Sequence, residues 1–388
     1  MFSIRLDIGI SMRLAKEIVR TFIFIFIILA CKGEDDLSVE ECNVTVMYDG
    51  ATLSVCEDDE VDSLVRDQDL FIWQAMNLFY YYQPDVPALA DDLFPNYKEL
   101  YNYLNRFSSS ESMFSEGLLS NSDRFSWIVD DYVALEESFQ GIGTSFGYEF
   151  RLLRESEGSS NLFGYVEYVI DDGPAYAAGL KRGDIFNKVN GIQLTTNNYQ
   201  NALFGTDAYR ITLAKIENNE ILSTNSSVSL AAVPLTENPI LYHDIIELEG
   251  LRAGYLVYNQ FIHNNNAHRE LNNVFGSFKS AGVSELILDL RYNPGGSVLT
   301  TRILASLIYA ATSSTEFGSI IFNDKLKDFF NNPLYFLEEL PIVDEDTNTT
   351  SIEEINSLNN LSRVFVLTSN STASASELLI VGLSPYLD

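Results

Sequence analysis

The first part of the chain has the hydrophobic pattern of helices. Residues 70–82 (LFIWQAMNLFYYY) are apolar on every side of a helical projection, which predicts a buried helix that ends at Pro84 and Pro87. Residues 88–135 continue with helical periodicity and polar breaks. We therefore expect a small helical N-terminal domain over residues 60–135, with its many aromatic side chains packed in the core.

After residue 140 the pattern changes to short β-like runs separated by glycines. Residues 164–170 (GYVEYVI) predict a strand. The stretch DDGPAYAAGLKRGDIFNKVNG at 171–191 then places a short helix that starts at proline, a Gly-Asp turn and an Asn-Gly turn in succession. These features predict a β-rich domain over residues 136–235.

The last part of the chain, residues 236–388, alternates strands and helices. Nearly all-apolar runs predict buried strands, and amphipathic stretches predict helices between them. The expected strands are 254–261, 285–290 and 364–367, and the expected helices are 272–281 and 300–311. Residues 338–360 are acidic and rich in Asn and Thr, so we expect an exposed loop or insertion there. The predicted fold class is therefore α/β multidomain.

The composition excludes several classes of function. Twenty-four Lys and Arg against 55 Asp and Glu give a net charge of −31 in 388 residues. This field repels phosphate, so nucleic acid is not an expected partner. Three cysteines and three histidines, without CxxC or HExxH, exclude the common zinc sites, and no G-x-G-x-x-G follows a strand. No metal or organic cofactor is implied.

The N-terminus has the pattern of a secretory signal. Arg13, Lys16 and Arg20 precede nine apolar residues, 22–30, a run too short to span a bilayer comfortably. The run ends in Ile-Leu-Ala-Cys at Cys31, which resembles the lipobox of bacterial lipoproteins, whose cysteine is lipidated. We expect an exported protein, anchored by lipid to the outer membrane on its periplasmic or cell-surface side. An ordinary signal peptide followed by an unrelated cysteine is the alternative.

Residues 31–59 have the composition of an acidic tether. Cys42 and Cys56 flank Asp49-Gly50, a hairpin signal between two β-rich stretches. An exported compartment permits a disulfide between these two cysteines. Two buried free thiols are the alternative.

Two segments end predicted buried strands with residues suited to catalysis. LDLRYNPGG at 288–296 ends in Gly295 and Gly296, whose uncovered backbone N–H groups can approach a ligand closely. TSNSTASASE at 368–377 places Ser374 at a helix N-terminus, which suits a nucleophile whose transition state is an oxyanion. The alternatives are a plain strand-to-helix connection at the glycines and an ordinary capping box, S-x-x-E, that starts at Ser374.

The stretch GPAYAAGLKRGDIFNKVNG resembles the second half of a PDZ domain, and the resemblance covers about residues 141–232. PDZ domains bind peptide C-termini by strand addition and hold the carboxylate in a nest of backbone amides. The matching loop here is Ser145, Phe146, Gly147 and Tyr148. A small β-domain with a closed groove is the alternative.

A helical segment, a PDZ-like domain and an α/β core in this order resemble the C-terminal-processing, or tail-specific, serine proteases. The resemblance covers roughly residues 70–388, and TASASE at 372–377 and LDLRYNPGG are its most specific parts. It implies that Ser374 is the nucleophile. It also implies that the oxyanion hole consists of the backbone amides of Ala375 and of either Gly295 or Gly296.

The resemblance further implies a lysine as the general base, made neutral by burial. In the family this lysine follows the serine helix, whereas the sequence here ends at Asp388. We therefore expect a C-terminally truncated copy, inactive by itself. His243 beside Asp244 could form half of a triad, but a histidine at a strand edge is the simpler interpretation. His263 and His268 lie in an Asn-rich stretch, and we expect them to be solvated.

The expected function is that of a serine endopeptidase whose PDZ domain binds protein C-terminal tails and whose dyad pairs Ser374 with a lysine beyond residue 388. The expected partners are proteins or peptides with free C-termini, and the membrane through the lipid anchor. The alternative is a surface lipoprotein that binds peptides on a protease-like scaffold without cleaving them. The expected domains are a signal peptide at 1–30, the tether at 31–59, the helical domain at 60–135, the PDZ-like domain at 136–235 and the truncated protease core at 236–388.

Overall fold

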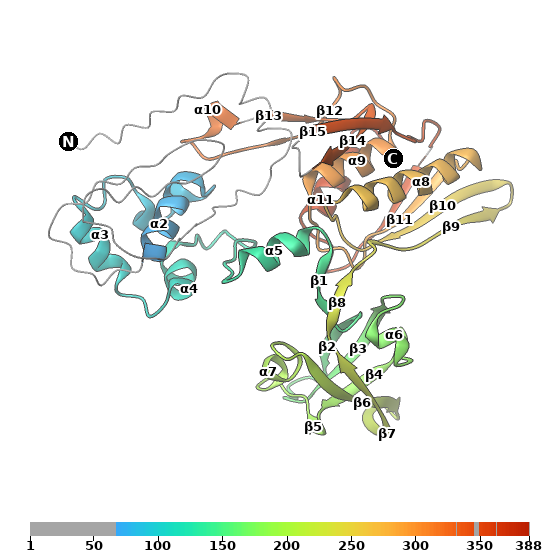
Figure 1. Ribbon diagram of the computed structural model, residues 1–388, viewed down its shortest axis with the longest axis horizontal. Coiled ribbons are helices and arrows are strands. Elements are labelled where there is room, and N and C mark those ends of the chain that lie inside the picture. The colour runs from blue at the N-terminus through green and yellow to red at the C-terminus, as the bar shows by residue number, and fades with distance from the viewer. Residues whose placement is uncertain (1–66, 331, 345–348, 362, 388) are drawn as a thin grey trace. The chain divides into compact units, whose positions relative to one another are not determined.

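The computed structural model describes residues 67–330, 332–344, 349–361 and 363–387, coloured along the chain in Figure 1. The chain divides into two compact units. Among the described residues, the first unit contains 67–130 together with 313–336, and the second contains 131–312 together with those from 337 onward. The expectation of a multidomain α/β protein with a helical N-terminal region is confirmed.

The first unit is built mainly from short helices around an apolar core. Leu89, Leu104, Met113 and Leu118 are completely buried in that core. The expected helix at 70–82 is observed as α2, although most of its side chains are half-buried rather than buried. The helical elements of this part are α2 (Asp67–Phe79), the 3-10 helices η1 (Gln83–Asp85) and η2 (Pro87–Leu89), α3 (Tyr97–Leu104), α4 (Ser110–Ser112) and the π-helix η3 (Met113–Leu118).

A later segment of the chain completes the first unit. It forms the antiparallel strands β12 (Glu316–Ile320) and β13 (Asn332–Tyr335) and the short helix α10 (Lys327–Phe330). The side-chain amide of Asn323 donates to the backbone oxygens of Leu78 (2.9 Å) and Tyr80 (3.0 Å) at the end of α2. The Tyr80 oxygen also accepts from the Gln83 N–H at 3.1 Å, so the segment adds to the capping of the C-terminal end of α2.

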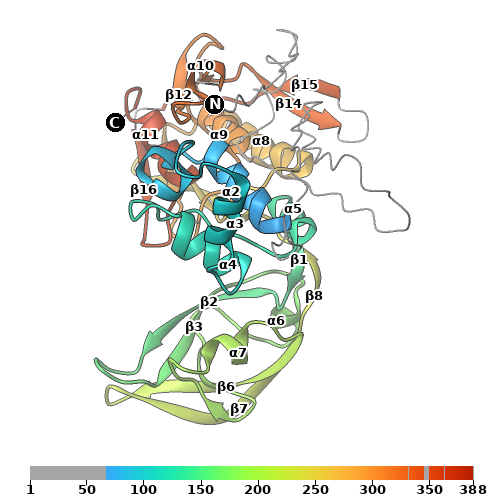
Figure 2. The same cartoon turned by 90° about the vertical axis from the view of Figure 1, so that its left-hand side faces the viewer.

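The second unit begins with α5 (Tyr132–Phe139) and a PDZ-like β-domain. The chain enters and leaves this domain through β1 (Ile142–Ser145) and β8 (Val233–Thr236), which pair antiparallel. The antiparallel sheet has the order β2-β3-β4-β6-β7, with β5 paired to β4, and Figure 2 shows β6 beside β7 and β2 beside β3. The remaining elements are β2 (Tyr148–Arg154), β3 (Leu162–Val169), α6 (Pro174–Ala177), β4 (Ile185–Val189), β5 (Ile192–Gln193), α7 (Tyr199–Leu203), β6 (Ala208–Glu217) and β7 (Glu220–Ala231).

The rest of the second unit has a four-stranded sheet of order β16-β11-β10-β9. β10, β11 and β16 run parallel and are joined through helices, whereas β9 pairs antiparallel with β10. Phe278 of α8 packs against Gly254 of β10, where a Cβ atom would lie only 3.0 Å from the phenyl ring. The elements are β9 (Ile240–Leu248), β10 (Leu251–Tyr258), α8 (Asn265–Ser280), β11 (Glu285–Asp289), α9 (Val298–Ile308), β16 (Arg363–Leu367) and α11 (Ala375–Leu383).

The acidic stretch at 338–360 is more regular than the expected exposed loop. It contains the antiparallel strands β14 (Glu339–Asp344) and β15 (Thr349–Glu354). Leu340 and Ile342 are buried, and the Arg269 guanidinium of α8 pairs with the Glu353 carboxylate at 2.7 Å. Alternating apolar residues therefore give this polar stretch one face that packs.

Of the helices in the described residues, none combines the length and the apolarity that crossing a bilayer requires.

Candidate active site

Ser374 occupies a strained backbone conformation between a strand and a helix. Its φ of 53° and ψ of −116° lie outside the regions that an L-residue with a Cβ atom prefers. The side chain is exposed, and the backbone N–H donates to the carboxylate of Glu377 at 3.0 Å. Backbone strain of this kind costs about 1–3 kcal/mol and is concentrated at functional sites. A sharp strand-to-helix turn of this type presents the nucleophilic serine in α/β-hydrolases.

Two glycines lie directly against this turn. Gly295 has a φ of +112°, and a Cβ atom there would meet the Cβ of Ser374 at 2.7 Å. Gly296 has a φ of +134°, and its Cβ atom would lie 2.3 Å from the backbone oxygen of Phe261. The turn is fixed to Phe261 on both sides, because the Phe261 N–H donates to the Gly295 oxygen (2.9 Å) and the Ser297 N–H donates to the Phe261 oxygen (2.7 Å). Both positions therefore require glycine.

Hydrogen bonds join two turns. The serine turn, residues 368–376, connects β16 to α11, and the glycine turn, residues 290–296, follows β11. The Thr372 hydroxyl donates to the backbone oxygen of Leu290 at 2.8 Å, and the Ser369 hydroxyl donates to the backbone oxygen of Arg291. The Ser376 hydroxyl donates to the backbone oxygen of Asn293 at 3.2 Å. The sequence predicted these segments separately, and the structure brings them together because β11 and β16 are neighbours in the sheet.

A buried acid at the end of β11 was not predicted from the sequence. The Asp289 carboxylate accepts hydrogen bonds from Arg291 Nε (2.9 Å) and from the Tyr255 hydroxyl (2.9 Å). Burial acts to raise the pKa of Asp289, but the bonds from Arg291 outweigh it and hold this pKa below its ordinary value. The ion pair between Asp289 and Arg291 fixes the backbone at the end of β11, where the chain continues into the glycine turn. An Asp-x-Arg spacing at a strand end is the signal that would have found it.

The predicted peptide-binding loop joins β1 to β2. The Gly147 N–H donates to the Ser145 hydroxyl at 3.0 Å, and the Phe146 oxygen accepts from the Ala175 N–H at 3.0 Å. The Tyr148 side chain is buried and its hydroxyl lies 2.8 Å from the hydroxyl of Tyr209, so that ring belongs to the domain core. β2 pairs with β3 alone in the described sheet, which leaves its other edge able to accept an added strand.

The other candidate residues lie outside this site or outside the described residues. Cys31, Cys42 and Cys56 precede residue 67, where the description begins. His243 is exposed on β9, a strand at an edge of its sheet. The expectation that His268 is solvated is wrong: it is 2% exposed on α8, with Nε2 2.9 Å from the Thr300 hydroxyl. The periodicity of α8 places it on the same buried face as Leu271.

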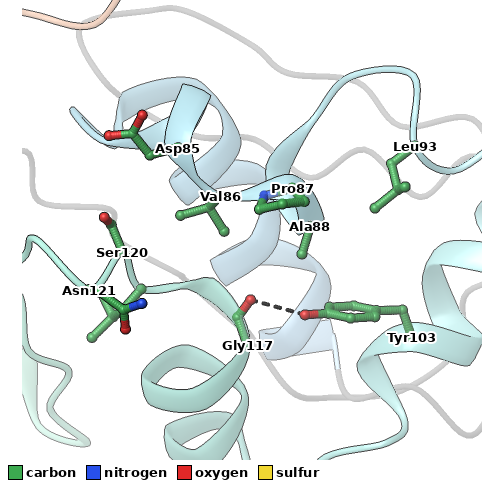
Figure 3. Close-up of a pocket in the computed structure, with 10 residues that line it drawn as sticks. Asp85, Val86, Pro87, Ala88, Leu93, Tyr103, Gly117, Ser120 and Asn121 are labelled. Atoms are coloured by element: carbon green, nitrogen blue, oxygen red, sulfur yellow. Dashed lines mark hydrogen bonds between the residues drawn. The ribbon is translucent and has the colours of Figure 1, made fainter.

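A separate cavity of about 420 Å³ lies in the first unit (Figure 3). Its walls come from the turn at 85–88, from Leu93 and from the segment at 117–121. The Tyr103 hydroxyl donates to the backbone oxygen of Gly117 at 2.9 Å and holds one wall in place. None of the residues that line it belongs to the serine turn or the glycine turn, so it is not part of the candidate active site.

Comparison with known proteins gives a match to one family. Residues 252–384 match the sequence profile of Peptidase family S41, and no curated protein matches the chain. A solved protein described as an S41 protease, from Bacteroides fragilis NCTC 9343, is similar over 85% of this chain and 78% of that chain, with 24% identity and a TM-score of 0.59. The photosystem II D1 C-terminal processing protease is similar over 83% of this chain and 79% of that chain, with 17% identity and a TM-score of 0.41.

Proposed function

We propose, from the match of residues 252–384 to Peptidase family S41, that the chain is a serine endopeptidase that cleaves proteins bound by their C-terminal tails. Ser374 is the proposed nucleophile. The observation that carries the proposal is the strained backbone of Ser374, held against Gly295 at the N-terminus of α11. An ordinary helix cap needs no such strain, because a capping serine adopts extended backbone angles.

The proposed chemistry is acyl transfer. Ser374 Oγ attacks the carbonyl carbon of the scissile bond while a general base takes its proton. Backbone N–H groups of Ala375 and of the glycine turn donate to the oxyanion of the tetrahedral intermediate. The intermediate then expels the amine, which takes up the proton, and water hydrolyses the acyl-enzyme. The positive end of the α11 dipole favours the negative charge at this position.

A lysine is the proposed general base. A buried amine is neutral at physiological pH and can accept the proton of a serine. Among the described residues, no lysine is hydrogen-bonded to Ser374. On the family resemblance, we assign the role to a lysine on a strand that follows the serine helix.

Substrate capture is assigned to the PDZ-like domain. The loop at 145–148 directly precedes β2, whose free edge can pair with an extended peptide. A net charge of −31 provides no long-range attraction for a tail carboxylate, so backbone amides and apolar contacts must hold it. The proposed substrates are therefore proteins or peptides with a free, accessible C-terminus.

Export and anchoring complete the proposal. We assign lipidation to Cys31 and place the mature protein at the outer membrane, facing the periplasm or the cell surface. Metabolic labelling with a tritiated fatty acid should mark the wild-type protein and not Cys31→Ser. Equal labelling of both proteins would remove the anchor from the proposal.

A serine-directed fluorophosphonate probe tests the catalytic assignment. The probe should label the wild-type protein and should not label Ser374→Ala. Ser384→Ala is the matched control, because Ser384 is exposed at the other end of the same helix, and it should be labelled as strongly as the wild type. Absence of label from the wild type, with tail peptides still bound, would favour the non-catalytic peptide-binding alternative.

A further inference from the structure

Asn293 is completely buried in the turn that precedes the two glycines. Its side-chain Oδ1 accepts a hydrogen bond from the Gly295 N–H at 2.9 Å, and its Nδ2 donates to the backbone oxygen of Tyr258 at 2.9 Å. If the side-chain amide of Asn293 were rotated by 180°, its NH₂ group would face the Gly295 N–H and its oxygen would face the Tyr258 oxygen. These two partners therefore fix the orientation of the amide. Each end of the amide therefore has a definite role.

The backbone of Asn293 also holds the serine turn. Its carbonyl oxygen accepts from the Ser376 hydroxyl at 3.2 Å and from the Ala373 N–H at 3.3 Å. One residue thus connects the end of β10, the glycine turn and the serine turn. A change in the position of Asn293 is transmitted to all three.

The bond to Oδ1 removes one of the two candidate donors from the oxyanion hole. The Gly295 N–H points at Asn293, whereas the Gly296 N–H has no acceptor among the described residues. The Ala375 N–H likewise donates to no acceptor in the described part of the chain. The two N–H groups left for a ligand are therefore those of Gly296 and Ala375.

We propose that Asn293 is a positioning residue that selects Gly296, rather than Gly295, as the oxyanion donor beside Ala375. This inference rests on the proposed serine-peptidase function. Without the side-chain amide, the buried Gly295 N–H and the Tyr258 carbonyl lose their partners, which is costly. The turn then rotates to satisfy them, and the Gly296 N–H moves away from the oxyanion position.

Steady-state kinetics on a peptide substrate test the selection of Gly296. Asn293→Ala should lower kcat about 100-fold with KM within about twofold, as expected for loss of one oxyanion donor. Asn293→Asp should regain activity as the pH falls, because only the protonated carboxyl can donate to the Tyr258 oxygen. An unchanged kcat, or a loss that appears in KM alone, overturns the proposal.

Asn272 supplies the matched control. Its side chain makes the same kind of bridge in another part of the second unit, accepting from the Asn356 N–H (2.8 Å) and donating to the Glu354 oxygen (2.9 Å). Asn272→Ala should lower Tm to a similar degree and leave kcat within about twofold. If Asn272→Ala lowers kcat as much as Asn293→Ala does, the effect is one of general stability and the proposal fails.

Amide exchange separates this inference from the proposed function. In protein labelled with ¹⁵N-glycine, the Gly295 N–H should exchange at least about tenfold faster in Asn293→Ala than in the wild type, because its acceptor is gone. Exchange at the same rate in both proteins overturns the role of Asn293. If the wild type cleaves no peptide but the exchange rates differ as expected, the peptidase proposal fails and the positioning of Gly295 by Asn293 stands.

Discussion

Gly295 is held so close to Ser374 that a Cβ atom on the glycine would lie 2.7 Å from the Cβ atom of the serine. The same atom would lie 2.9 Å from the backbone nitrogen of Ala375. The space between the two turns is therefore that of a hydrogen atom and no more. A side chain at residue 295 would therefore displace Ser374 or the start of α11.

Gly295→Ala should push Ser374 out of position and lower kcat by about 100-fold, since misplacement of a reacting group by about 1 Å has effects of this size. Gly282→Ala is the control. Gly282 also has a positive φ (+71°), but no atom lies within 4 Å of its added Cβ, so it carries backbone strain without the contact. Kinetics on a peptide substrate distinguish the two variants, and equal kcat values would contradict the proximity argument.

Ser374→Gly and Ser374→Ala should both be inactive but should differ in stability. Both lose the hydroxyl, yet only glycine adopts a φ of 53° with a ψ of −116° without strain. Ser374→Gly should therefore be more stable than Ser374→Ala by about 1–3 kcal/mol. Urea unfolding measures the difference. If alanine is equally stable, the serine is not strained in solution.

Burial of His268 predicts a loss of stability in acid. Mainly through burial, its pKa is lowered to about 3, while the unfolded chain takes up the proton near pH 6.5. The stability is thus fully present above about pH 6.5 and is lost at about 1.4 kcal/mol per pH unit as the pH falls toward the folded-state pKa. His263 is the neighbouring titratable ring, with centroids 5.6 Å apart, and it acts in the same direction.

His268→Gln isolates this contribution. The Thr300 hydroxyl donates to the Ile262 oxygen at 2.8 Å, so it accepts from His268 Nε2–H, and a glutamine Nε2–H can replace that donor. The free energy of unfolding, measured by denaturant titration between pH 6 and pH 4.5, should depend less steeply on pH in the variant, by about one proton. Parallel curves for the two proteins would exclude His268 as the source.

Binding of tails should depend on the terminal carboxylate. On the Ser374→Ala protein, a peptide with a free C-terminus should bind at least about tenfold more tightly than the same peptide amidated, because a nest of backbone amides favours the anion. Fluorescence anisotropy of a labelled peptide measures both affinities. Equal values would rule out the loop at 145–148 as a carboxylate site.

The sequence predicted local features where the residues alone determine the backbone. Asn190 and Gly191 have φ values of 50° and 81°, the positive pair that an Asn-Gly hairpin turn needs. The order of strands and helices around Ser374 was predicted for the same reason, since apolar runs and small hydroxyl residues mark them directly. The match of residues 252–384 to the profile of Peptidase family S41 agrees with the resemblance that these motifs carry.

Features that depend on distant partners were not predictable. The start of α8 was missed because the cap is made by Asn264, whose Oδ1 accepts from the Ala267 N–H at 2.7 Å, within a run of asparagines that looks like a loop. With the helix starting too late, His268 was left outside it and was expected to be solvated. Asn293 was likewise recognised as part of a turn, but its partners Tyr258 and Ala373 are far away in the sequence.

The discontinuity of the first unit sets an order of events during translation. Asn323, which caps α2 through Leu78 and Tyr80, is made long after residue 130. At about 5–20 residues per second, the ribosome needs roughly 10–40 s to proceed from residue 130 to residue 336. The N-terminal helices are therefore made before the Asn323 amide can bind the end of α2, while most of the second unit is still being synthesised.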